Sequence, residues 1–236
     1  MSLPVAILAG GLATRLRPVT ETIPKALVEV AGRPFAEHQL DWLTGQGIDH
    51  VVFCVAYRGE MIRQALGDGS RWKLQIEYVF DGGTLLGTAG ALKHALPALG
   101  AAFFVLYGDS LLTCSLPSVE RSFRASGRGG LMTVFRNDDQ WDRSNVLFKE
   151  GRILRYDKSN RTPDMRHIDY GLGVLTDRAL VKVPGDRPFD LAAVYQQLLA
   201  ADDLAGMEVS ERFYEIGSPE GLEETRAFLA GQSGAR

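Results

Sequence analysis

The chain has 236 residues and a formal net charge of −3, which excludes a general nucleic-acid-binding surface because non-specific binding to phosphate backbones needs a basic face. Its two cysteines are too few for a disulfide framework, and no apolar run approaches the ~20 residues of a membrane span. We therefore expect a cytoplasmic protein, not bound to a membrane, with one sizeable α/β domain.

The first informative stretch is residues 3–25, which begin with a short apolar strand at residues 5–8. Unbroken branched residues are typical of a strand buried on both faces of a parallel sheet. The strand stops at Gly10-Gly11, where bare backbone N–H groups can point at a ligand. Arg15 and Lys25 flank the same loop, and this combination favours a polyphosphate ligand. For the glycine pair alone, a tight turn without a ligand is the alternative.

Strands and helices then alternate. We expect strands at residues 50–55, 74–80 and 102–107 and helices at 35–45 and 59–66, with a further helix capped by Thr88. This alternation predicts a parallel sheet with right-handed crossovers. Ligands bind such sheets at the carboxyl ends of the strands, where Gly10-Gly11 and Asp81-Gly82-Gly83 fall.

The segment L-L-G-T-A-G-A-L at residues 85–92 has few bulky side chains. Gly87 leaves room, and a flat first helical turn at residues 89–91 could support a nucleotide base. Close packing of a small-residue helix against the sheet explains the same pattern.

Asp109 follows a strand and Gly108, a position suited to a ligand of a hard cation. The alternative is an ordinary helix cap.

The second half begins with a strand at residues 130–135 and a polar loop at 136–145, in which Trp141 and Asn145 could form a lid or contact a sugar. A hairpin at 146–156 leads to Asp157-Lys158, for which a surface ion pair is the alternative to a site. A strand at 167–174 contains two glycines, which suggests close approach by a ligand or a second backbone. An amphipathic helix within 189–199 and a last helix from Pro219 to near Leu229 complete the chain, with a disordered tail.

The whole constellation resembles the sugar-1-phosphate nucleotidylyltransferases, whose signature is L-A-G-G-x-G-T-R-L-x-P followed by P-K. The matching residues are Leu8, Ala9, Gly10, Gly11, Thr14, Arg15, Leu16, Pro18, Pro24 and Lys25. Ala13 departs from the pattern, because the family usually has glycine there. If that position needs a positive φ, alanine costs about 1 kcal/mol.

The resemblance implies a three-layer α/β/α, Rossmann-like fold with a mixed, mostly parallel sheet, of the nucleotide-diphospho-sugar transferase type. Residues 1–236 would form a single domain, with a nucleotide-binding half at 1–110 and a sugar-phosphate-binding half at 111–230. The hexapeptide-repeat domain that some relatives append is absent from the sequence.

The same resemblance implies the site residues. The catalytic residues would be Arg15, Lys25, Asp109 and Lys158. The nucleotide would be bound by Leu8, Ala9, Gly10, Gly11, Thr14, Arg15, Asp81, Gly87 and Thr88, and the sugar phosphate by Asn145, Asp157, Lys158, Asp169, Tyr170 and Gly171. Asp109 and Glu215 would bind Mg²⁺, with Glu215 standing where the family motif W-x-D-I-G-T-P-E has aspartate.

The implied reaction joins a sugar 1-phosphate to the α-phosphorus of a nucleoside triphosphate and releases pyrophosphate. The segments L-L-G-T-A-G and R-H-I-D-Y-G-L-G look closest to the heptose and mannose 1-phosphate guanylyltransferases, which indicates GTP and D-glycero-α-D-manno-heptose 1-phosphate. A UTP- or GTP-dependent enzyme for a hexose, mannose or muramate 1-phosphate is one alternative. A catalytically weak sugar-nucleotide-binding regulatory protein is another, because Ala13 and Glu215 depart from the family pattern. The sequence leaves a homodimer open.

Overall fold

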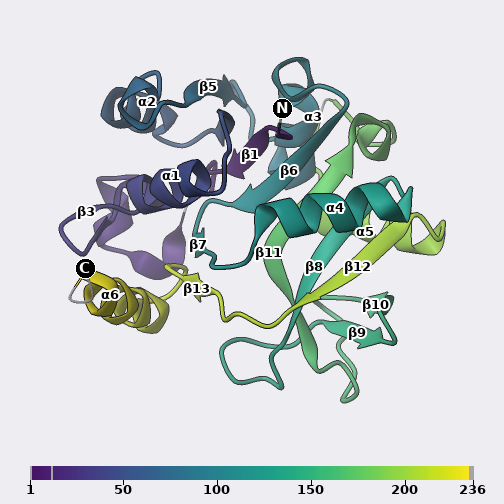
Figure 1. Ribbon diagram of the computed structural model, residues 1–236. Coiled ribbons are helices and arrows are strands. Elements are labelled where there is room, and N and C mark those ends of the chain that lie inside the picture. The colour runs from purple at the N-terminus through teal and green to yellow at the C-terminus, as the bar shows by residue number, and fades with distance from the viewer. Residues whose placement is uncertain (1, 12, 186, 234–236) are drawn as a thin grey trace.

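Four parallel strands form the half of the main sheet that contains the N-terminal strand (Figure 1). They are β1 (Val5–Leu8), β4 (His50–Val55), β5 (Gln75–Phe80) and β6 (Ala102–Tyr107), in the spatial order β6-β1-β4-β5. The computed structural model describes residues 2–11, 13–185 and 187–233. The parallel sheet predicted from the alternation of strands and helices is confirmed.

Helices cover both faces of this sheet. The helices α1 (Phe35–Gly45), α2 (Gly59–Leu66) and α4 (Leu116–Ser126) pack on one face, and α3 (Gly87–Leu99) and α5 (Leu191–Ala200) pack on the other. Successive residues of β1 point to opposite faces, so that Val5 and Ile7 join the first core while Ala6 joins the second. The result is the predicted three-layer α/β/α architecture.

The other half of the sheet makes it mixed. Strand β11 (His167–Thr176) runs antiparallel to β6 and to β8 (Gly130–Arg136), and β12 (Leu204–Val209) pairs parallel with β8. The hairpin of β9 (Val146–Lys149) and β10 (Arg152–Tyr156) extends the sheet beyond β11. The register of β11 against β8 shifts between Asp169 and Gly173, and Gly171 has a φ of +89°. A glycine accommodates this backbone without the strain of a side chain.

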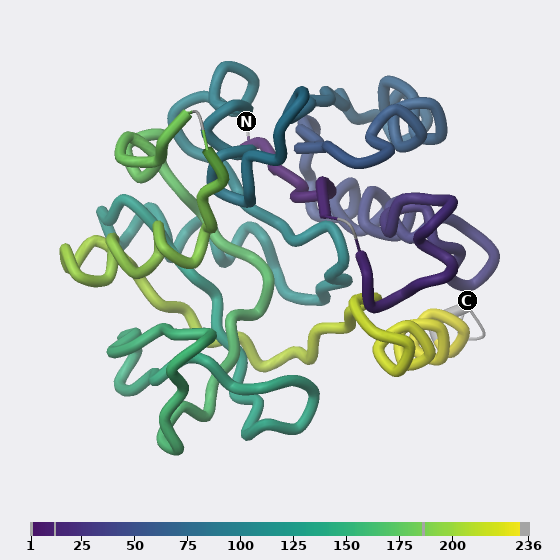
Figure 2. The backbone as a smooth tube through the Cα atoms, turned by 180° about the vertical axis from the view of Figure 1, so that it is seen from behind, coloured from purple at the N-terminus to yellow at the C-terminus, as the bar shows by residue number. Residues whose placement is uncertain are grey.

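The C-terminal segment crosses back to the N-terminal half, as Figure 2 shows for the yellow end of the chain. Its strand β13 (Tyr214–Glu215) pairs with β7 (Ser110–Leu111), and β2 (Glu29–Val30) pairs with β3 (Arg33–Pro34). The last helix, α6 (Pro219–Ser233), packs with these segments in a third, smaller core. Short 3₁₀ turns lie at Thr14–Leu16, Val19–Glu21, Lys25–Leu27, Ser70–Trp72 and Asp177–Leu180.

Two expectations about local structure need correction. Thr88 does not cap α3, which begins one residue earlier, at Gly87. The last helix continues to Ser233, so residues 230–233 of the expected disordered tail are helical, and 234–236 lie outside the described residues. Neither α4 nor β12 was predicted. Within the described part of the chain, no helix has the length and apolarity needed to cross a bilayer.

Candidate active site

Hydrogen bonds from residues outside the glycine loop that follows β1 hold the loop in place. Ala13 has φ 49° and ψ 44°, so the position does require the left-handed conformation that favours glycine. The buried hydroxyl of Thr20 donates to the Ala13 carbonyl at 2.8 Å. Arg58 donates to the carbonyls of Glu21 at 2.6 Å and Thr22 at 2.9 Å. These bonds fix the segment that leads to Lys25.

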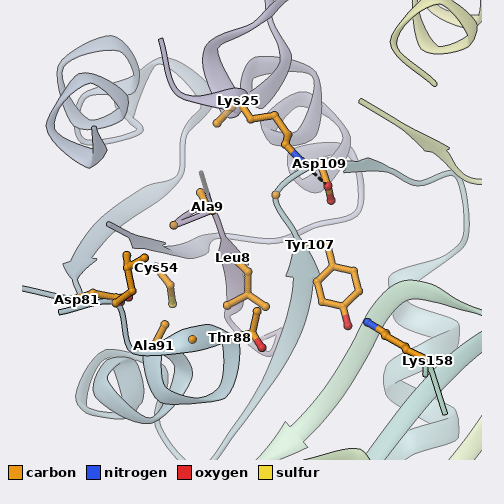
Figure 3. Close-up of a pocket in the computed structure, with 16 residues that line it drawn as sticks. Leu8, Ala9, Lys25, Cys54, Asp81, Thr88, Ala91, Tyr107, Asp109 and Lys158 are labelled. Atoms are coloured by element: carbon orange, nitrogen blue, oxygen red, sulfur yellow. Dashed lines mark hydrogen bonds and ion pairs between the residues drawn. The ribbon is translucent and has the colours of Figure 1, made fainter. Parts of the chain in front are cut away.

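A first cavity of about 410 Å³ opens beside this loop. Its lining includes most of the predicted nucleotide-binding residues, namely Leu8, Ala9, Gly10, Gly11, Asp81, Gly87 and Thr88, together with Lys25, Asp109 and Lys158 (Figure 3). A Cβ added to Gly11 would meet no atom within 4 Å, so this glycine faces open space. Thr14 and Arg15 do not line this cavity.

The start of α3 closes the far end of the first cavity. Asp81 accepts a hydrogen bond from the Leu86 N–H at 2.9 Å, and burial raises the pKa of its carboxyl. A Cβ on Gly87, whose φ is +71°, would lie 2.7 Å from the Phe189 carbonyl oxygen. Thr88 accepts a hydrogen bond from the Leu191 N–H at 2.7 Å and so joins α3 to α5. The small residues of this turn thus serve close packing, while Gly87, Thr88 and Ala91 also line the cavity.

Two carboxylates and two cations lie near one another beside the first cavity, which only Lys25 and Asp109 of the four line. Lys25 Nζ donates to Asp109 Oδ2 at 2.8 Å. Pairing of β13 with β7, together with a hydrogen bond from the Ile216 N–H to the Asp109 carbonyl at 2.9 Å, brings Glu215 beside Asp109. A Cβ on Gly217 would lie 3.0 Å from Arg15 Nη2 and 3.1 Å from Glu215 Oε2, so both side chains face this glycine.

The electrostatics of Glu215 suit a bound cation. Burial raises the pKa of Glu215 above its usual value, and the charge of Asp109 raises it further, whereas Arg15 and Lys25 oppose the shift. Among the described residues, no three or more histidine, cysteine or acidic side chains lie close enough together to hold a metal ion without further ligands. Mg²⁺ is commonly held by one or two carboxylates together with substrate phosphates, so Asp109 and Glu215 fit this ion.

A second cavity of about 320 Å³ adjoins the first and shares Tyr107, Asp109 and Lys158 with it. Its lining contains the predicted residues Asn145, Asp169, Tyr170, Gly171 and Glu215. It also contains residues that the sequence analysis did not single out, namely Ser110, Asp142, Arg143, Arg161, Ile168 and Phe213. The junction of the two cavities is therefore formed by a carboxylate, a lysine and a tyrosine.

Lys158 is held at this junction but is not captured by a close ion pair. Its Nζ lies 3.9 Å from Asp169 Oδ2 and 5.3 Å from the centroid of the Tyr107 ring. Asp169 Oδ2 accepts hydrogen bonds from the hydroxyls of Tyr107 at 3.0 Å and Tyr156 at 3.2 Å. Its Oδ1 accepts from the Gly171 N–H at 3.1 Å. The side chain of Asp169 is only 5 % exposed, whereas that of Lys158 is 46 % exposed and available to a ligand. Figure 3 shows Lys158 beside Tyr107.

Two predicted sugar-binding side chains have other partners. Asp157 accepts hydrogen bonds from the N–H groups of Asn160 at 2.8 Å and Ser159 at 2.9 Å, which lower the pKa of its carboxyl. It does not line the second cavity. The Tyr170 ring packs edge-on against Phe213, with centroids 5.9 Å apart. A sugar contact by either side chain stays a prediction.

Comparison with known proteins gives consistent matches. Residues 5–144 match the family model described as Nucleotidyl transferase. Over 218 residues, the chain is 30% identical to the mannose-1-phosphate guanylyltransferase catalytic subunit beta of Drosophila pseudoobscura pseudoobscura, covering 90% of this chain and 58% of that protein. It is 28% identical over 203 residues to a UTP–glucose-1-phosphate uridylyltransferase of Synechocystis, covering 78% of this chain and 52% of the relative. The chain thus spans little more than half the length of these curated relatives.

A solved structure shares the fold. It is described as a putative glucose-1-phosphate thymidylyltransferase from Bacillus anthracis in complex with a sucrose, and it aligns with a TM-score of 0.86 at 19% identity. The alignment covers 96% of this chain and 95% of that one. The likeness confirms the predicted fold class.

Proposed function

The chain belongs to the nucleotidyl transferase family, and on that premise we propose that it joins a sugar 1-phosphate to a nucleoside monophosphate taken from a nucleoside triphosphate. The observation that carries the proposal is the pair of cavities that meet at Asp109 and Lys158. The first cavity, beside the glycine loop, would take the triphosphate, and the second would take the sugar 1-phosphate. Residues 1–110 and 111–230 would then form the two halves of a single domain.

In the proposed reaction an oxygen of the sugar phosphate attacks the α-phosphorus, and a new P–O bond forms while the bond to the β-phosphate oxygen breaks. Pyrophosphate leaves with the electron pair of the broken bond. The nucleophile is already an anion near neutral pH, so no general base is needed. The obstacle is repulsion between two anions, and the protein must neutralise charge while holding both in line.

The side chains at the junction have separate tasks in this proposal. Lys158, exposed between the cavities, would hold the sugar phosphate. Lys25 would offset charge at the α-phosphate, exchanging its present partner Asp109 for the substrate. Arg15, which lies near Glu215 and Gly217 outside the first cavity, would contact the departing pyrophosphate. Asp109 and Glu215 would hold Mg²⁺, which when bound supplies charge neutralisation at the reacting phosphates.

For the substrates we propose GTP and D-glycero-α-D-manno-heptose 1-phosphate. The names of several curated relatives, which are mannose-1-phosphate guanylyltransferases, support a guanylyl donor. The heptose rests on the sequence resemblance alone. The Synechocystis relative, named for UTP and glucose 1-phosphate, favours a uridylyltransferase as the second candidate. Cytoplasmic location and a homodimer stay predictions.

A pyrophosphate-release assay tests the proposal. GTP, UTP, CTP and dTTP would each be combined with the 1-phosphates of heptose, mannose, glucose and N-acetylmuramic acid, with Mg²⁺ present. We expect the fastest release with GTP and the heptose 1-phosphate. Faster release with UTP and another sugar would favour the second candidate. Tight binding of a sugar nucleotide without release from any pair would indicate the regulatory protein instead.

A further inference from the structure

One wall of the second cavity is a loop with a fixed internal shape. Residues 137–145, here called the wall loop, contribute Asp142, Arg143 and Asn145 to the cavity. The side-chain amide of Asn137 donates to the Asp142 carbonyl at 2.5 Å, and the Ser144 N–H donates to the Asp139 carboxylate at 2.6 Å. Its two ends are fixed by hydrogen bonds from the N–H groups of Asn137 and Asn145 to the carbonyls of Arg166 and His167, both at 2.9 Å. The position of the middle of the loop therefore depends on what holds it from outside.

The opposite wall is the segment that leads into β13. Phe213 and Glu215 line the second cavity, and Phe213 packs against Tyr170. Side chains alternate along an extended segment, so Arg212 and Tyr214 lie on the side away from the cavity. Tyr214 there stacks on Phe228 of α6, with ring centroids 3.9 Å apart.

Arg212 joins the two walls. Its guanidinium carbon lies 3.3 Å from the centroid of the Trp141 ring, in the middle of the wall loop, and 4.7 Å from the centroid of the Tyr214 ring. The guanidinium also forms an ion pair with Glu224 of α6. Trp141 is 43 % exposed, and Arg212 covers one side of its ring. We call Trp141, Arg212 and Tyr214 the clasp.

The burial of the Nε atom of Arg212 is costly. This atom is buried and has no hydrogen-bond partner among the residues that the structure describes. An unpaired buried donor destabilises the fold, so a surface arginine with no further role would be expected to turn this nitrogen toward water. Stacking between two rings and the pair with Glu224 hold it in place.

We propose that Arg212 is a positioning residue that sets the width of the second cavity by clasping the wall loop to the strand that carries Glu215. This inference rests on the proposed function, because that function assigns the second cavity to the sugar 1-phosphate. None of the three clasp residues lines either cavity. It acts through Asp142 and Asn145 on one wall and through Phe213 and Glu215 on the other.

The first test compares hydrogen–deuterium exchange of the wall loop in the ligand-free wild type and in Arg212→Ala. Arg226→Ala is the matched control, because it removes a guanidinium that pairs with Glu223 on α6 without touching either wall. We expect exchange of residues 138–145 to rise about fivefold or more in Arg212→Ala, the size expected for loss of a partly desolvated cation–π contact. We expect no change in the control.

The second test measures KM for GTP and for the heptose 1-phosphate. We expect Arg212→Ala and Trp141→Ala to raise the sugar-phosphate KM about tenfold while the KM for GTP stays within about twofold. Trp141→Phe keeps an aromatic ring over the guanidinium, so its KM for the sugar phosphate should stay close to the wild-type value.

Unchanged exchange in Arg212→Ala, or an equal rise of both KM values, would overturn the inference. If the wild type turns over no sugar 1-phosphate, the proposed function fails on its own. The exchange comparison then decides alone whether Arg212 holds the wall loop.

Discussion

Substituting Tyr107→Phe should destabilise the protein and weaken binding of the sugar 1-phosphate. The change removes the hydroxyl that donates to Asp169 Oδ2 at 3.0 Å and keeps the ring beneath Lys158. Burial, and next the charge of Asp169, raise the pKa of Tyr107 well above its usual value, so the hydroxyl stays a donor throughout the working pH range.

The size of the effect follows from the burial of Asp169. A hydrogen bond to a buried charged group contributes about 1.5–3 kcal/mol, and a 2 kcal/mol loss in a chain of this length lowers Tm by about 4–8 °C. With one donor gone, Asp169 Oδ2 should draw Lys158 Nζ closer than its present 3.9 Å. The ammonium is then less available to a phosphate, so we expect the sugar-phosphate KM to rise about fivefold.

Thermal unfolding and pyrophosphate-release kinetics would measure these two effects, with Tyr78→Phe as the control. The Tyr78 hydroxyl donates to the neutral Gly67 carbonyl at 2.7 Å, and Tyr78 lines neither cavity. We expect the control to lose about 1 kcal/mol and to keep its KM. If Tyr107→Phe loses no more stability than Tyr78→Phe and keeps the wild-type KM, the role given to the Tyr107 hydroxyl is wrong.

Three further substitutions test separate parts of the site. Lys25→Ala should lower kcat in the pyrophosphate-release assay by about 10²–10³, because it removes a preorganised charge, and unchanged turnover would refute its assignment. Glu215 has a raised pKa, so its ionised form destabilises the folded protein at pH 7. Glu215→Gln should therefore raise the urea midpoint of unfolding at pH 7, and this gain should disappear below the usual Glu pKa of 4.5. Turnover should be lost. A lower urea midpoint at pH 7 would contradict this reasoning. Ala13→Gly should raise the free energy of unfolding by about 0.5–1 kcal/mol by relieving a φ of 49°, and a lower Tm would show that the alanine is not strained there.

The parallel half of the sheet could be predicted because its strands are short and mostly apolar, although Gln75 and Glu77 interrupt β5, and because helical segments separate them. A local sequence pattern could have predicted helix α4, because Ser115 caps it and Pro117 lies in its first turn. Strand β12 is harder to predict, because Gly206 interrupts its apolar pattern. A Cβ on Gly206 would lie 2.8 Å from the Phe148 ring and 2.9 Å from Ile153, a packing requirement set by a distant hairpin.

The site shows the same division between local and distant causes. The turn at Asp157 could have been inferred from the aspartate followed by Ser159 and Asn160, a typical pattern of side-chain capping in turns. Thr88 could not be placed from its neighbours, because its partner Leu191 is distant in the chain. The sequence places Tyr107 directly before Gly108-Asp109, but the hydrogen bond from the Tyr107 hydroxyl to Asp169 depends on the pairing of β11 with β6.

A crystal structure with a non-hydrolysable GTP analogue, the heptose 1-phosphate and Mg²⁺ would test the central claim most directly. We predict that the guanine and ribose occupy the cavity beside Gly11 and Thr88, that the sugar lies between Asn145 and Phe213, and that the two phosphates meet at Lys158. Ligands bound on separate surfaces, with Lys158 remote from both phosphates, would contradict the account.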